Sequence, residues 1–256
     1  MRLKAFVISE DRSKPIALDE AMSIVESQCG DALNSFTKGN ILYRGIDGKR
    51  QDTQALYIEP KKYTRESRNT TNTYTLVMDN APKWRSYPKR SQSIICSTSE
   101  ETARGFGFLF YVFPKDGAKY GVAPEEDLWW SFKPTVGVPL DDFNDAIEHW
   151  LSKNLLNIHD FADFKTYKDL IKKFKEVDNA IKKDSIDNLI LADIWEPLIN
   201  YNGDLLSLVQ EVFDPKKNGF KVTKSLNGLP KNKEVWTDQP SVLIYDEAIT
   251  KNWNKT

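Results

Sequence analysis

The sequence has few of the residues on which metal sites and histidine-based catalysis depend. Its 256 residues include two cysteines, Cys29 and Cys96, and two histidines, His149 and His159. Two scattered pairs do not provide the closely spaced ligands of a zinc site, and two cysteines cannot form a disulfide framework. The scarcity of histidine also disfavours a His-based hydrolase. We therefore expect no metal site and a reducing compartment, the cytoplasm.

Long hydrophobic runs and a large net charge of either sign are also lacking. No apolar run is long enough to span a bilayer, and the N-terminal MRLKAFVISEDRSKP has no signal-peptide core. The 36 Lys and Arg residues balance 37 Asp and Glu residues, so no global basic excess indicates nucleic acid. Hydrophobic residues make up 40% of the chain, which is enough for a core. We expect a cytoplasmic protein with no membrane partner.

The common nucleotide and nucleophile motifs are missing as well. The sequence contains no GxxxxGK[ST] phosphate loop and no GxSxG nucleophile elbow, and GFG at 105–107 is too short for a dinucleotide fingerprint. DPKKNG at 214–219 begins like an EF-hand loop, but Lys216 occupies a ligand position and no Glu follows at the required place. We predict a plain turn there.

Hydrophobic periodicity predicts an α+β fold, with strands on both sides of a helical segment. We expect a core formed by residues 1–135 and 216–256, and a helical insertion over 136–215, which is almost free of Gly and Pro from Leu140 to Phe213. The pattern predicts helices over 17–36 and 98–107. It predicts strands over 3–9, 40–46, 54–60, 74–80, 93–97 and 108–114, a short one within 115–124, one over 127–132, and three after residue 218, of which the last two are 233–238 and 241–248.

Three features that could carry chemistry occur in a fixed order along the chain. LYRGI places Arg44 near a strand end, where a guanidinium can fork onto a phosphate, and Gly45 lets a ligand approach the backbone. Ser97, Thr98 and Ser99 then end an apolar strand, where Ser99 is also a suitable N-cap for the next helix. Finally, KEVWTD places Glu234 on a late strand.

This order of arginine, strand-borne Ser-Thr-Ser and late glutamate resembles the Arg-Ser-Glu class of ADP-ribosyltransferases, in outline over residues 17–125 and 220–246. The segments YPKRSQSIICSTS and DGAKYGV are similar to phage-encoded proteins. The resemblance implies a split β-sheet core of ADP-ribosyltransferase type, interrupted by the helical insertion. It also implies an enzyme that moves ADP-ribose from NAD, as substrate, to a macromolecular acceptor, either protein or nucleic acid.

The resemblance further implies roles for individual residues. Arg44 would neutralise the pyrophosphate of NAD, and Ser97 would bond the ribose next to nicotinamide. Glu234 would accept a hydrogen bond from the 2′-hydroxyl of that ribose and stabilise the positive charge that develops as nicotinamide leaves. An aromatic wall for nicotinamide would come from Phe106, Phe108 or Tyr111. The implied NAD-binding residues are thus Arg44, Gly45, Ser97, Thr98, Ser99, Phe106 and Tyr111.

Two observations leave the identity of the catalytic carboxylate open. The family often has an acidic or amide residue two positions before the glutamate, and here that residue is Asn232. The distance from Ser99 to Glu234 is also long. Glu125 and Asp127, in the run Glu125-Glu126-Asp127 before LWW, are therefore alternative catalytic carboxylates.

Two other functions remain alternatives to the transferase. The first is a non-catalytic binding protein, a phage-type structural or inhibitory protein that keeps the fold without turnover. The second is a nucleic-acid-binding module that uses the loop 83–90, in which cations alternate with aromatic rings. The residues concerned are Lys83, Trp84, Arg85, Tyr87, Lys89 and Arg90.

Overall fold

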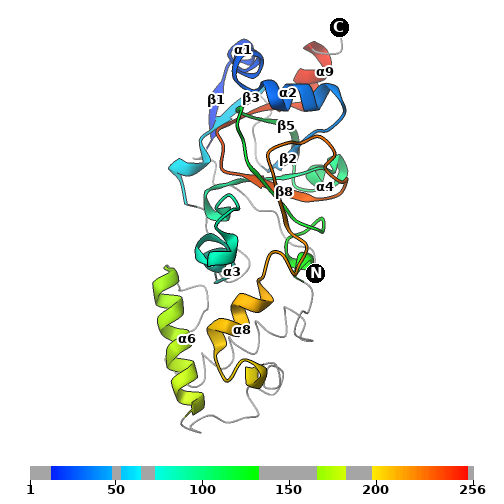
Figure 1. The fold of residues 1–256 in the computed structure, drawn as a ribbon. Coiled ribbons are helices and arrows are strands. Elements are labelled where there is room, and N and C mark those ends of the chain that lie inside the picture. Colours follow the sequence, from blue (N-terminus) through cyan, green and yellow to red (C-terminus); the bar gives the residue numbers. More distant parts are fainter. Residues whose placement is uncertain (1–12, 48–52, 65–72, 133–165, 183–197, 253–256) are drawn as a thin grey trace. The chain divides into compact units, whose positions relative to one another are not determined.

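The computed structural model describes residues 13–47, 53–64, 73–132, 166–182 and 198–252 (Figure 1). The chain divides into two compact units. We call residues 1–66, 86–128 and 220–256 the sheet unit, and residues 67–85 and 129–219 the helical unit. The strand predicted over 3–9 and both histidines lie outside the described residues.

Nine strands of the described residues form one antiparallel sheet in the order β1-β3-β9-β5-β2-β4-β8-β6-β7, and the fold is α+β as the periodicity predicts. The apolar runs around positions 56, 110 and 243 form its buried centre. The strands are β1 (Ser13–Ile16), β2 (Tyr43–Ile46), β3 (Ala55–Ile58), β4 (Ile94–Ser97), β5 (Phe108–Pro114), β6 (Tyr120–Val122), β7 (Lys221–Thr223), β8 (Glu234–Thr237) and β9 (Ser241–Tyr245).

The sheet is almost divided in two between β2 and β4. Within the described residues, Tyr43 and Ser97 are the one residue pair that joins these two strands. By contrast, β2 and β5 share pairs along the whole of β2, and β4 and β8 along the whole of both. The Nη1 atom of Arg44 on β2 donates a hydrogen bond to the carbonyl of Ile95 on β4, and so adds a second link across this junction.

Two helices pack on the sheet where the sequence predicts one. Helices α1 (Leu18–Gln28) and α2 (Gly30–Thr37) are separated at Cys29, whose φ of −125° and ψ of 36° are not helical. The buried thiol of Cys29 donates to the carbonyl of Phe113 on β5 at 3.5 Å, and the N–H of Asp31 donates to Asp116 Oδ1 at 2.8 Å. These contacts with the end of β5 hold the chain where the helix is broken.

Two strand predictions are wrong. Residues 74–80 lie in a helix, α3 (Thr73–Asn80), which buries Val77 and Met78. Residues 127–132 form no strand but contain the short 3₁₀ helix η5 (Trp129–Ser131). Both segments are short and apolar, and such runs do not by themselves distinguish a strand from a buried turn of helix.

The helical unit contains α6 (Tyr167–Lys182) and α8 (Leu205–Val212). Helix α6 buries Leu170 and Phe174, and α8 buries its own apolar face. The N-terminus of α8 is capped twice, because Asp178 Oδ1 accepts from Leu205 N–H and Asp204 Oδ1 accepts from Ser207 N–H, both at 2.8 Å. In the sheet unit, α9 (Asp246–Asn252) follows β9 directly, so the strand predicted to 248 ends at 245. None of the described helices is both long and apolar enough to cross a membrane.

Candidate functional site

The three residues of the Arg-Ser-Glu pattern lie on three neighbouring strands of the sheet. Ser97 on β4 is paired with Tyr43 of β2 on one side and with Glu234 of β8 on the other. Arg44 follows Tyr43 on β2. The side chains of Arg44, Ser97 and Glu234 are all buried. Ser97 and Glu234 are directly paired and present their side chains on one face of the sheet, whereas Arg44, the residue after Tyr43, belongs by strand alternation to the other face.

The carboxylate of Glu234 is held by two donors. Arg90 Nη1 lies 2.5 Å from Glu234 Oε1, and the N–H of Leu128 donates to Oε2 at 3.3 Å. The side chain of Arg90 is 2% exposed and that of Glu234 is 10% exposed. An ionised carboxylate has about four lone-pair sites. These donors use two of them.

The alternative carboxylates lie beside Glu234. Its backbone N–H donates to the carbonyl of Glu125 at 3.2 Å, and its own carbonyl accepts from Ala123 N–H at 2.9 Å. Glu125 and Asp127 are half-buried, whereas Glu126 is exposed. The structure thus brings the segment that carries the alternative carboxylates next to β8, and the choice between them and Glu234 stays open.

The Ser-Thr-Ser triplet forms the turn between β4 and α4 (Glu100–Arg104). Ser97 Oγ accepts from Ser99 N–H at 2.9 Å, and Ser99 Oγ accepts from Thr102 N–H at 3.2 Å, so the predicted N-cap is confirmed. Thr98 Oγ1 donates to Pro230 O and accepts from Lys233 N–H, both at 2.9 Å. The triplet therefore also fixes the segment that leads into Glu234.

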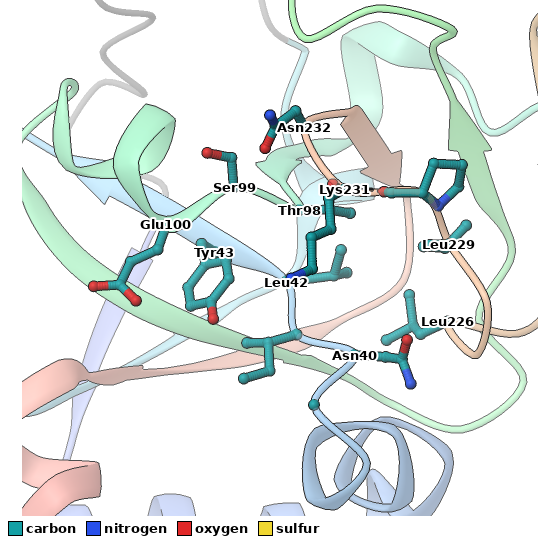
Figure 2. Close-up of a pocket in the computed structure, with 13 residues that line it drawn as sticks. Asn40, Leu42, Tyr43, Thr98, Ser99, Glu100, Leu226, Leu229, Lys231 and Asn232 are labelled. Atoms are coloured by element: carbon teal, nitrogen blue, oxygen red, sulfur yellow. Dashed lines mark hydrogen bonds between the residues drawn. The ribbon is translucent and has the colours of Figure 1, made fainter.

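A pocket of about 310 Å³ opens beside the triplet (Figure 2). Its walls are the chain before β2, the start of α4 and the segment 226–232. Thr98 and Ser99 line it, as does Asn232, whereas Arg44, Ser97 and Glu234 do not. Its polar lining comes from Asn40, Thr98, Ser99, Glu100, Lys231 and Asn232, beside the Tyr43 ring and the apolar Leu42, Leu226 and Leu229.

Most of these pocket residues were not predicted from the sequence. Thr98, Ser99 and Asn232 were singled out by the resemblance, but Asn40, Tyr43 and Lys231 were not. The run SLNGLPKNK before Glu234 contains Gly, Pro and Asn residues that indicate a loop. Nothing in it indicates a pocket, because the opposite wall comes from a segment near residue 40.

Arg44 and Gly45 are both enclosed by protein. Burial lowers the pKa of Arg44, while nearby Cys96 and Glu234 act in the opposite direction. Arg44 Nε has no hydrogen-bond partner among the described residues. A Cβ at Gly45 would lie 2.8 Å from Phe106 Cβ and closer still to the carbonyl oxygen of Ala103. The element that approaches the backbone at Gly45 is therefore the end of α4.

The three aromatic candidates for the nicotinamide wall have different surroundings. Phe106 is half-buried next to Gly45, and the ring of Phe108 packs edge-on against Tyr245. The Tyr111 ring lies 5.3 Å from that of Tyr43, which lines the pocket. Burial, together with the negative charge of Asp246, raises the pKa of Tyr111. Tyr111 is thus the candidate with a direct contact to a pocket residue.

The basic and aromatic loop at 83–90 is used largely within the protein. Trp84 is 2% exposed and its Nε1 donates to Phe213 O at 2.7 Å. Tyr87 stacks on Trp236, and Arg90 is buried against Glu234. Base stacking requires an accessible ring face. The buried Trp84 and the stacked Tyr87 therefore give the nucleic-acid alternative little support.

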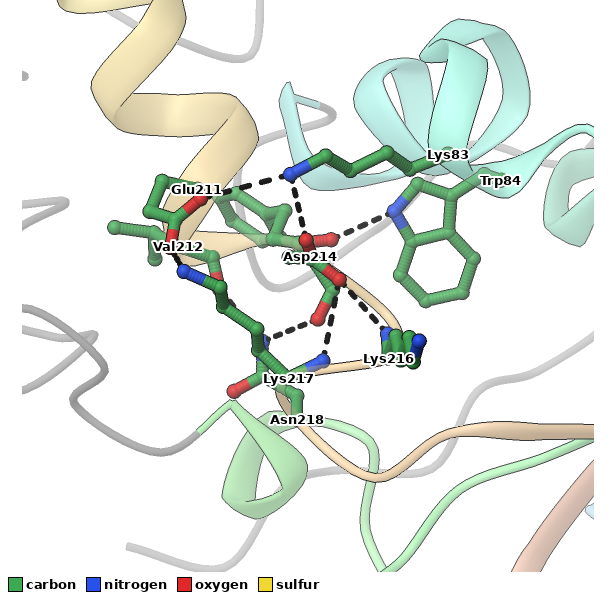
Figure 3. A network of polar contacts seen from close by, with 9 residues as sticks. Lys83, Trp84, Glu211, Val212, Asp214, Lys216, Lys217 and Asn218 are labelled. Carbon is green, nitrogen blue, oxygen red and sulfur yellow. Dashed lines mark hydrogen bonds and ion pairs between the residues drawn. The ribbon is translucent and has the colours of Figure 1, made fainter.

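The turn predicted at 214–219 is confirmed. Asp214 Oδ1 accepts from the N–H of Lys216 and Lys217 at 2.9 and 3.1 Å, and its Oδ2 pairs with Lys83 Nζ at 2.6 Å (Figure 3). Asn218 Nδ2 donates to the carbonyls of Val212 and Asp214. In the part of the chain that the structure describes, no cluster of three or more His, Cys, Asp or Glu residues could hold a metal ion.

This network predicts an acid-sensitive contribution to stability. Burial alone would raise the pKa of Asp214, but Lys83 and the N–H groups of Lys217 and Lys216 outweigh it and lower that pKa. The ionised carboxylate therefore stabilises the fold above the unfolded-state pKa of about 4, and this is lost as pH falls through the folded-state value. We expect Asp214→Asn to lower the free energy of unfolding by about 1 kcal/mol at pH 7 and hardly at all at pH 2.

Urea unfolding at several pH values measures this difference. Glu59→Gln is a control, because Glu59 makes an i,i+3 pair with Lys62 whose side chains are largely exposed, and such pairs contribute little. A loss of stability in Asp214→Asn that is the same at pH 7 and pH 2 would contradict the prediction.

The chain matches no protein-family model, no curated protein and no solved structure, so what the site does has to be inferred from its own residues.

Proposed function

We propose that the protein is an ADP-ribosyltransferase that moves ADP-ribose from NAD to a macromolecular acceptor, with Glu234 as the catalytic carboxylate. The observation that carries the proposal is the register of three strands. Ser97 is paired with Glu234 on one side and with Tyr43, the neighbour of Arg44, on the other. The register therefore brings the serine and the glutamate of the Arg-Ser-Glu pattern side by side.

The shape of the sheet also supports the proposal. Its near division between β2 and β4 is consistent with a split sheet of ADP-ribosyltransferase type, in which the two halves meet at the site. In this proposal Arg44 has a mechanical role as well, because its bond to Ile95 O links the two halves.

The proposed reaction breaks the bond between C1′ of the nicotinamide ribose and the nicotinamide nitrogen. Nicotinamide leaves with the bonding electron pair, and positive charge develops on C1′ and the ring oxygen. The Glu234 carboxylate accepts a hydrogen bond from the 2′-hydroxyl and stabilises this charge. The acceptor nucleophile then forms a bond to C1′ and gives up a proton to solvent or to a neighbouring base.

The pocket provides surroundings that suit part of a dinucleotide. The Tyr43 ring and Leu42 offer an apolar wall for a planar base, and the Asn40 and Asn232 amides both donate and accept hydrogen bonds. Lys231 adds a cation at the same pocket. These residue types match a base, a ribose and a phosphate in turn.

The test is transfer of label from adenine-labelled NAD into a cell lysate. We expect Glu234→Gln to reduce transfer at least about 100-fold, as expected when one transition-state stabilising group is removed. Glu26→Gln, an exposed substitution on α1, is the matched control and should leave transfer unchanged. Protease and nuclease treatment of parallel samples identifies the acceptor class.

The same assay separates the alternatives. Transfer that survives Glu234→Gln but is lost in Glu125→Gln or Asp127→Asn would move the catalytic carboxylate to the neighbouring segment. Absence of label with NAD unconsumed would overturn the transferase. The buried Arg90–Glu234 pair would then favour a binding protein that keeps the fold without turnover.

A further inference from the structure

Residues 87–90 lie against β8 and contact it at Trp236 and Glu234; we call them the strap. Tyr87 stacks on Trp236 with ring centroids 6.2 Å apart and planes inclined by 17°. Trp236 Nε1 donates to the carbonyl of Pro88 at 3.0 Å. At the other end, Arg90 Nη1 lies 2.5 Å from Glu234 Oε1. The strap thus contacts the carboxylate proposed for catalysis and the tryptophan two residues after it.

Trp236 gives the strap a rigid support. Its side chain is fully buried, with Phe220 at its edge and Tyr87 stacked on it. Gly121, its partner on β6, leaves room for the ring. The Arg90 guanidinium carbon lies 5.7 Å from the Trp236 ring centroid, within the range of a cation–π contact. The Arg90 guanidinium therefore lies between the buried Trp236 ring and the Glu234 carboxylate.

This arrangement compensates the burial of the Glu234 carboxylate and fixes the direction in which the carboxylate points. A buried carboxylate is costly unless an opposite charge and hydrogen bonds compensate it, and Arg90 supplies both. Because Arg90 and Leu128 N–H bind different oxygens, they also fix the plane of the carboxylate. A carboxylate with a fixed plane presents its unused lone pairs in one direction only.

We propose that Arg90 is the positioning residue of this site: supported by Trp236, it holds the Glu234 carboxylate in the direction in which it meets the substrate. The inference rests on the proposed function, since it assigns Arg90 a role that is exerted through Glu234. The proposal also assigns a role in the site to Arg90, which the sequence places in the basic loop 83–90.

Steady-state kinetics with NAD test this role in Arg90→Gln and Arg90→Lys. We expect Arg90→Gln to lower kcat about 100-fold per folded molecule, with the KM for NAD changed less than about threefold, because misplacing a catalytic group affects the transition state more than ground-state binding. Arg90→Lys keeps the charge without the planar fork and should recover part of kcat. Arg85→Gln, an exposed arginine of the same loop, is the matched control.

A structural measurement tests the ion pair without relying on activity. Urea unfolding is compared for Arg90→Gln, Glu234→Gln and the double variant. Each single change leaves a buried charge uncompensated, so we expect each to raise the equilibrium constant for unfolding by more than about a hundredfold. The double variant should lose much less than the product of the two effects.

The outcomes distinguish the two proposals. Wild type that turns over NAD while Arg90→Gln keeps its kcat would overturn the positioning role and leave the transferase standing. Wild type without turnover would overturn the transferase, and the positioning role with it. Strictly multiplicative stability effects would show that Arg90 and Glu234 are not coupled, which overturns the inference whatever the activity. If Arg90→Gln does not fold, partial recovery of kcat in Arg90→Lys still decides.

Discussion

Gly45→Ala is expected to destabilise the sheet unit by about 3 kcal/mol or more, although it adds a single methyl group. The added Cβ would lie 2.8 Å from Phe106 Cβ and closer still to the carbonyl oxygen of Ala103. That oxygen belongs to the backbone of α4, so no side-chain rotation relieves the contact. The alternative is to move α4 away from β2, which also displaces Ser99 and the triplet that caps this helix.

Urea unfolding followed by circular dichroism measures this effect without any substrate. Gly30→Ala is the matched control, because the nearest atoms to its added Cβ are 3.6 Å away and Gly30 is the first residue of α2. Alanine is the better helix former, so this control should be neutral or slightly stabilising. A Gly45→Ala variant as stable as wild type but impaired in NAD binding would show instead that Gly45 makes room for a ligand.

The elements predicted correctly are those whose signal is local. The apolar run at 108–114 and the run at 241–245 form central strands of the sheet, and the hydroxyl of Ser99 caps the helix that follows it. The break at Cys29 could not be predicted, because it depends on contacts with Phe113 and Asp116 that are distant in the sequence. The strand predictions for 74–80 and 127–132 were wrong because each segment is short and apolar, and its conformation depends on the residues that pack against it.

In the candidate site, too, local features could be predicted from the sequence and contacts between distant residues could not. The strands that carry Arg44, Ser97 and Glu234 were predicted from their local apolar runs, whereas their adjacency in the sheet is a finding of the structure. Nothing in the sequence indicates that Arg90 pairs with Glu234, since a cation in a loop with other cations is typical of a solvated surface. The contacts of Trp236 with the strap bring Arg90 close to Glu234. The Trp236 ring itself needs the room that Gly121 leaves on β6, and this neighbour is present only in the folded sheet.

That space is provided by Gly121, and Gly121→Ala is expected to have the second large effect. A Cβ at this position would lie 2.7 Å from Trp236 Nε1 and closer to two carbons of the ring. Displacing the ring breaks its hydrogen bond to Pro88 and removes the support of the Arg90 guanidinium. We expect a loss of about 3 kcal/mol of stability and, in the molecules that remain folded, a fall in kcat.

Gly121→Ala differs from Gly45→Ala in what the new methyl group meets. The clash at Gly121 is with a side chain, so a smaller residue at position 236 should relieve it. We expect the double variant Gly121→Ala with Trp236→Leu to be less destabilised than the sum of its single changes by about 1 kcal/mol or more, measured by urea unfolding. Additive effects would contradict this steric coupling. Recovered stability should not restore kcat, because leucine gives the Arg90 guanidinium no aromatic face, and Glu234 would again lack a fixed direction.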